Sequence, residues 1–167
     1  FTFLETFNGM SFPEAVEFLA RRASIPLPEK ADPKEAARNA QAREKKDLLL
    51  RINKLAAVFY HQNFKSLPES HPARVYAQER GITDEIVEKF RIGYSPAEWQ
   101  GVTNLLKGKK APLALAETLG LVKPKRNAKP EDSHFDIFRD RLMFPIFSAV
   151  GDVIGFGGRT LDPEGLP

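Results

Sequence analysis

The chain contains no cysteine in its 167 residues, which excludes disulfides and cysteinyl zinc sites from this stretch and indicates a reducing compartment. No apolar run approaches the ~20 residues that span a bilayer, so we expect no contact with a membrane. The first residues, Phe1 to Glu5, lack the basic leader of a signal peptide. Because the chain starts without Met and stops in a loop-like Gly165-Leu166-Pro167, we expect it to be a fragment.

Tryptophan and tyrosine are also scarce, with one and three copies against 13 phenylalanines. Hydrophobic residues make up 42% of the chain and charged residues 28%, which is enough for a buried core under a well-solvated surface. The net charge of +3 is compatible with a polyanionic partner without requiring one.

The first half of the chain has helical periodicity. Ser11 to Glu14 form a capping box that predicts a helix ending near Arg22. Residues 24–33 contain three prolines and predict a linker. A second helix starts at Asp32-Pro33; its first half has no apolar stripe, whereas an apolar face begins at Leu48. We place a domain boundary near residues 28–45.

Short helices are expected next, over residues 73–80, 83–90 and 111–119. Thr83 should cap the second of these, which should bury Ile86, Val87 and Phe90. A capping box at residues 95–98 predicts another helix that carries Trp99 into the core with Val102, Leu105 and Leu106. Residues 124–130 are polar and predict an exposed loop.

After residue 134 the periodicity becomes strand-like. Residues 141–147 and 153–157 flank a Gly151-Asp152 turn and predict a β-hairpin, with Pro145 at a sheet edge or on a bulge. The predicted fold class is therefore α+β, with a helical N-terminal half followed by a small antiparallel sheet.

Three motifs stand in order along the chain: Tyr76 to Thr83 (YAQERGIT), Phe135 to Ile146 (FDIFRDRLMFPI) and Gly151 to Arg159 (GDVIGFGGR). They resemble the bacterial DnaG-type DNA primase family, in which matching segments precede the metal-binding Toprim fold. The opening segment through Val16 resembles the stretch that follows the family's zinc ribbon. The likeness is weak over residues 28–70 and 107–134.

The resemblance implies a DNA primase, a nucleotidyltransferase that makes short RNA primers from NTPs on single-stranded template. Residues 1–27 would be a helical tail after the zinc-binding domain, 28–45 a linker and exposed helix start, and 46–167 the incomplete N-terminal subdomain of the catalytic core. The Zn ligands and the carboxylates for Mg or Mn would lie outside the chain, so the fragment alone would be inactive. The implied partners are template DNA, NTPs, the RNA primer and, through a missing C-terminal region, the replicative helicase. A cytoplasmic, nucleoid-associated monomer is expected.

Four arginines are the candidate nucleic-acid contacts, because a guanidinium makes paired charge-assisted bonds to phosphate. Arg139 and Arg141 would share one face if they lie on one strand, and Arg159 would end the neighbouring strand. We expect the guanidinium groups on these adjacent strands to face one common groove that holds a single unpaired strand. By resemblance these three and Arg80 match basic residues that contact template or nucleotide. The alternatives are salt bridges with Asp136, Asp140 and Asp152, and for Arg80 a bond to helix-end carbonyls.

Gly155, Gly157 and Gly158 do not complete a dinucleotide-binding fingerprint, because Thr160 stands where the third glycine belongs. They predict a place where another backbone approaches closely, or else a β-bulge. No residue pattern indicates a catalytic or metal site within the chain. Two other hypotheses remain: a non-catalytic module that docks a helicase, and a phage or plasmid primase of the same family.

Overall fold

The structure, a computed structural model, describes residues 2–8, 10–25, 33–126 and 134–161. The chain divides into two compact units, residues 1–42 and 43–167. The first unit contains α1 (Thr2–Asn8) and α2 (Phe12–Arg22). The capping box of α2 is confirmed: the Ser11 amide donates to the Glu14 carboxylate at 2.8 Å, and this bond lowers the pKa of Glu14.

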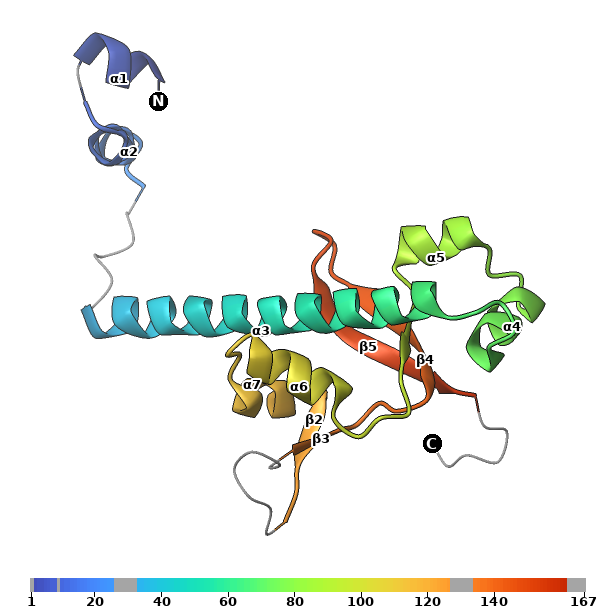
Figure 1. The fold of residues 1–167 in the computed structure, drawn as a ribbon. Helices are drawn as coiled ribbons and strands as arrows, with labels where there is room; N and C mark the ends of the chain where they lie inside the picture. The colour runs from blue at the N-terminus through green and yellow to red at the C-terminus, as the bar shows by residue number, and fades with distance from the viewer. Residues whose placement is uncertain (1, 9, 26–32, 127–133, 162–167) are drawn as a thin grey trace. The chain divides into compact units, whose positions relative to one another are not determined.

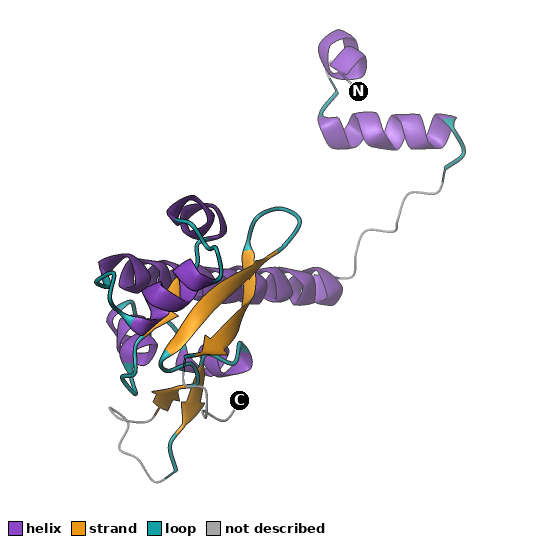
Figure 2. Cartoon of the chain, turned by 90° about the vertical axis from the view of Figure 1, so that its right-hand side faces the viewer, coloured by secondary structure: helices purple, strands orange, loops and turns teal. Residues whose placement is uncertain are grey.

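The long helix α3 (Pro33–Ser66) runs straight through both views as one continuous element (Figures 1 and 2). Residues 34–47 are exposed on every side, as the missing apolar stripe predicted. Farther along, Ile52, Ala56, Tyr60 and Phe64 are buried at spacings of four. The burial of α3 therefore begins where the apolar face of the sequence begins.

A three-stranded antiparallel sheet lies against the second half of α3, in the order β1 (Gly93–Ser95), β4 (Arg141–Phe147) and β5 (Val153–Thr160) (Figure 1). The hairpin β4–β5 is confirmed. Pro145 lies in the part of β4 beyond its pairing with β1, next to an irregularity in the β4–β5 register, in agreement with the edge or bulge prediction. A second sheet pairs β2 (Val122–Pro124) with β3 (His134–Asp136).

Four short helices cover this framework: α4 (Pro72–Glu79), α5 (Asp84–Phe90), α6 (Gly101–Gly108) and α7 (Leu113–Thr118). One core cluster joins α3, α6 and α7 to the sheet through Tyr60, Leu106 and Met143. The other joins α4 and α5 to the opposite sheet face through Leu142. Gly93 lets β1 approach α3, because a Cβ there would lie 2.6 Å from the Tyr60 backbone. The α+β prediction is confirmed.

Several local predictions are wrong. Ser95 does not cap a helix: it lies in β1, where its hydroxyl donates to the Phe138 carbonyl at 2.6 Å, and α6 starts six residues later. Thr83 does cap α5, but of the three residues expected in the core only Val87 is buried; Ile86 is 36% and Phe90 50% exposed. The strands β1, β2 and β3 were missed, because three residues are too few to show a period of two.

Most of the predicted linker over residues 24–33, and residues 127–130 of the predicted loop, lie outside the described residues. Within the described part, no helix is both long and apolar enough to pass through a membrane.

Candidate nucleic-acid interface

Asp136, at the end of β3, anchors the loop that carries Trp99. Its side chain is buried, and its two oxygens accept the amides of Val102 and Thr103 at 2.7 and 2.9 Å and the Thr103 hydroxyl at 2.7 Å. Burial raises the pKa of Asp136, and the bonds from Thr103 and Val102 offset part of that rise. The carboxylate thus caps the start of α6 from a different part of the chain.

The backbone of Asp136 also fixes Trp99, since its amide donates to the Trp99 carbonyl at 2.8 Å. Trp99 is 59% exposed, so the prediction that it lies in the core is wrong. It meets the Phe135 ring edge-on, with centroids 5.9 Å apart. Sequence spacing assigned Trp99 to a helix that starts only after it, which explains the error.

Arg139 lies over this indole. Its guanidinium carbon is 4.1 Å from the centroid of the Trp99 ring and 5.8 Å from that of Phe135, and its Nη1 donates to the Asp136 carbonyl. We call Trp99, Phe135 and Arg139 the aromatic corner. Its cation is held by two rings and a carbonyl, and its indole remains open to solvent.

Arg139 and Arg141 do not share a strand face, so that prediction is wrong. Arg139 lies in the loop before β4, and Asp140 between them has a left-handed backbone with φ +47°. Arg141 opens β4, where its Nη1 lies 3.4 Å from the Gly158 carbonyl. The turn at Asp140 breaks the alternation on which the prediction depended.

Arg159 is exposed and stands opposite Leu142 in the β4–β5 register, whereas Arg141 stands opposite Thr160. Directly opposed residues share a face and neighbours alternate, so Arg141 and Arg159 belong to opposite faces of the hairpin. The expectation of one common face for these arginines is therefore wrong.

Arg80 caps the end of α4 and is exposed, with its guanidinium 5.3 Å from the Tyr76 ring centroid. Since α4 packs on the Leu142 face of the sheet, Arg80 and Arg159 belong to that side. The carboxylates of the salt-bridge alternative have other partners: Asp136 binds α6, and Asp140 accepts the Tyr94 hydroxyl at 2.7 Å. The charge of Arg139 still helps to lower the pKa of Asp136 against the larger effect of burial.

The three glycines of β5 differ in what surrounds them. At Gly158 a Cβ would lie 2.8 Å from the Phe138 ring and 3.1 Å from the Arg141 side chain, so a neighbouring part of the chain itself approaches there. At Gly157 a Cβ would meet nothing within 4 Å, and at Gly155 only the tip of Ile146 at 4.0 Å. The bulge falls at Ile154, which the register skips, not at the glycines.

The described residues offer no group of three or more His, Asp or Glu side chains arranged to hold a metal ion. The part of the chain that the structure describes therefore supplies no ligand set for Zn, Mg or Mn.

Comparison with known proteins identifies the family. Residues 59–167 match the model of the DNA primase catalytic core, N-terminal domain. The DNA primases of Halalkalibacterium halodurans and Synechococcus elongatus are each 37% identical to the chain, over 98% and 97% of its residues. The chain spans about a quarter of the length of these curated relatives, 26% and 23%.

Solved structures agree. A DnaG primase catalytic domain bound to single-stranded DNA is similar to this chain, with TM-score 0.64 and 30% identity. The match covers 73% of this chain and 38% of the chain of that domain. The RNA polymerase domain of Mycobacterium tuberculosis DnaG, in complex with double-stranded DNA bearing a 6-nucleotide overhang, matches 71% and 35% at TM-score 0.63 and 34% identity. The Aquifex aeolicus primase, comprising zinc-binding and RNA polymerase domains, matches 99% of this chain and 36% of its own at TM-score 0.61 and 25% identity. The chain therefore belongs to the bacterial DnaG-type DNA primase family, whose catalytic core begins with this N-terminal domain.

Proposed function

We propose that the whole protein is a DNA primase that makes short RNA primers on single-stranded template during replication, and that this chain supplies template and nucleotide contacts. The observation that carries the proposal is the aromatic corner: an exposed indole whose guanidinium partner is fixed in place. A related catalytic domain has been seen bound to single-stranded DNA, which supports the same ligand class.

The aromatic corner suits an unpaired strand for two physical reasons. Every base has an apolar face, so an exposed indole can stack on it whatever its sequence, and such stacking is worth about 1–3 kcal/mol per base. A guanidinium beside the indole can reach a phosphate of the same nucleotide. Double-stranded DNA, whose bases are already stacked, would gain only the phosphate contact.

The other predicted residues contribute from different sides. Arg141 lies close to the aromatic corner along the chain and contacts phosphate there in our proposal, whereas Arg80 and Arg159 would contact the strand or a nucleotide on the α4 side of the sheet. Gly155 and Gly157 leave β5 open to a close backbone approach. Gly158 is removed from that set, because Phe138 occupies its surroundings.

In the whole protein, we assign residues 1–27 to the tail of a zinc-binding domain, 28–45 to the linker and 46–167 to the start of the catalytic core. Metal-dependent nucleotidyl transfer, with Mg or Mn, belongs to parts outside this chain. NTPs, the RNA primer and a replicative helicase are the further partners, and the protein acts as a cytoplasmic, nucleoid-associated monomer.

The test is single-stranded oligonucleotide binding by the full-length protein, measured by fluorescence anisotropy over a salt series. Arg139→Ala/Arg141→Ala is compared with Arg38→Ala/Arg43→Ala, which removes the same charge from the exposed part of α3. We expect the first variant to lose about tenfold or more in affinity and to have a shallower salt slope, and the control to change by less than about twofold. Equal affinity and slope for the two variants would refute the assigned role.

A helicase-docking module is the second candidate, because residues 34–47 of α3 are exposed on all sides. In a pull-down with the replicative helicase, binding that survives loss of all four arginines but not of the exposed helix would favour this candidate.

A further inference from the structure

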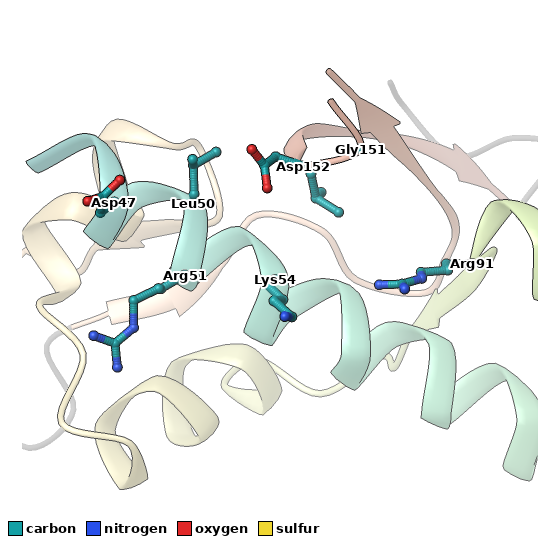
Figure 3. A pocket seen from close by; sticks show the side chains of 8 residues that line it. Asp47, Leu50, Arg51, Lys54, Arg91, Gly151 and Asp152 are labelled. Atoms are coloured by element: carbon teal, nitrogen blue, oxygen red, sulfur yellow. The ribbon is translucent and has the colours of Figure 1, made fainter. Parts of the chain in front are cut away.

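A cavity of about 410 Å³ lies between α3, the residue that follows α5, and the turn of the β4–β5 hairpin. None of the predicted nucleic-acid contacts lines it. Five charged side chains line it together with the apolar Leu50 and Val153. The charged residues are Asp47, Arg51, Lys54, Arg91 and Asp152 (Figure 3).

The charges around this cavity are held apart. Among the residues that the structure describes, no ion pair or hydrogen bond involves the side chains of Lys54, Arg91 or Asp152, although both signs face the same space. In Figure 3 Arg91 extends along the cavity toward Lys54, while Asp152 points toward Leu50 on α3. Lys54 and Arg91 therefore lie on one side of the cavity and Asp152 on the other.

Arg91 has a left-handed backbone, φ +50°, at the end of α5. Glycine or asparagine is the usual residue at such a position, because a Cβ costs energy there. The backbone conformation at the end of the helix, rather than contacts with neighbouring side chains, sets the direction of the Arg91 side chain. That side chain extends into the cavity.

We propose that this cavity binds a nucleoside di- or triphosphate. Lys54 and Arg91 take the phosphates, Arg51 adds positive charge at the rim, and Asp152 accepts a ribose hydroxyl or a base amino group. Leu50 and Val153 contact the flat apolar faces of the base. The volume is within the usual range for small-molecule sites.

The mixed charge argues for this ligand class over its rivals. A nucleic-acid strand would carry its repeated phosphates past Asp47 and Asp152, which repel them, and inorganic phosphate would leave both carboxylates and the apolar floor unused. A nucleotide places its charge at one end and neutral donors at the other. This site is separate from the aromatic corner and does not depend on the proposed template contacts.

The first experiment maps ADP binding to the 167-residue chain by NMR. We expect saturable shifts of the Gly151, Asp152 and Val153 amides, with weaker effects from pyrophosphate and none from adenosine. No saturable shift at these amides, or shifts confined to Trp99, Phe135 and Arg139, would overturn the proposal without bearing on template binding.

The second experiment measures ADP affinity by calorimetry in variants whose thermal unfolding matches the unaltered chain. Lys54→Gln/Arg91→Gln should weaken ADP binding about tenfold or more, because the loss of one charge-assisted hydrogen bond raises the dissociation constant by roughly a factor of ten. The control Arg38→Gln/Arg43→Gln should leave the affinity within about twofold. Asp152→Asn should weaken ADP but not pyrophosphate. Two results would reject a nucleotide site. The control pair could weaken ADP binding as much as Lys54→Gln/Arg91→Gln does, or a single-stranded oligonucleotide could displace ADP and lose as much affinity as ADP does in that double variant.

Discussion

The aromatic corner and the charged cavity are two cationic regions built in opposite ways. Arg139 is fixed by the Trp99 ring at 4.1 Å and by the Asp136 carbonyl. The carboxylate of Asp136 is itself fixed, because it accepts three hydrogen bonds. Lys54 and Arg91 are exposed and have no side-chain partner in the described residues. The aromatic corner is ordered before a ligand binds. In the cavity, Lys54 and Arg91 become ordered only on binding, and the loss of side-chain conformational entropy reduces the affinity.

Asp136→Ala should have the largest effect, because it leaves two amides and a hydroxyl at the start of α6 without an acceptor. We expect the free energy of unfolding in urea to fall by about 3 kcal/mol or more, and oligonucleotide affinity to fall with it. ADP binding to the folded fraction should persist, since the cavity shares no residue with this network. A stable variant with normal oligonucleotide affinity would show that Asp136 does not organise the aromatic corner.

Gly158→Ala should destabilise the chain by about 1–3 kcal/mol, because the new Cβ would lie 2.8 Å from the Phe138 ring. Gly157→Ala is the matched control on the same strand, where nothing lies within 4 Å, and should change stability by less than about 0.5 kcal/mol. Thermal or urea unfolding of both variants decides the point; equal effects would show that the packing of Phe138 on β5 is unimportant.

Trp99→Ala tests the exposed indole directly. It should reduce single-stranded oligonucleotide affinity about tenfold, with Trp99→Phe retaining most of it, because stacking needs a flat ring rather than the indole itself. Double-stranded affinity should change little. Equal losses for single-stranded and double-stranded DNA would argue against stacking and for a general distortion of the aromatic corner.

Glu88→Gln should give the smallest effect and a defined pH dependence. Lys65, at 2.5 Å, and His61 lower the pKa of Glu88 from its ordinary 4.5. A lowered pKa in the folded state means that the carboxylate stabilises the fold above pH 4.5 and loses that contribution as the pH falls through the lowered value. The stability difference between the original chain and the variant should therefore vanish in acid, which unfolding curves from pH 3 to 7 can check. A constant difference over that range would contradict the assignment.

Local sequence was a good guide wherever one pattern ran long enough. The Ser11 cap, the change in α3 at Leu48 and the Gly151-Asp152 hairpin all follow from neighbouring residues, and the structure has them. The Ser95 capping box failed because a hydrogen bond to Phe138, 43 residues away, draws that segment into β1. The prediction that Trp99 is buried was wrong for the same reason. Its loop is fixed by Asp136, which is too far along the chain to enter a prediction from neighbouring residues.

By itself, the sequence determined the helix–sheet order and the family motifs, because these depend on hydrophobic period, turn chemistry and residue identity along a short stretch. Tertiary structure alone decided which side each arginine faces, because a left-handed turn at Asp140 and the β4–β5 register set those directions. It also decided that Arg139 meets Trp99 and that Lys54 shares a cavity with Arg91, since both pairs join distant parts of the chain through folding.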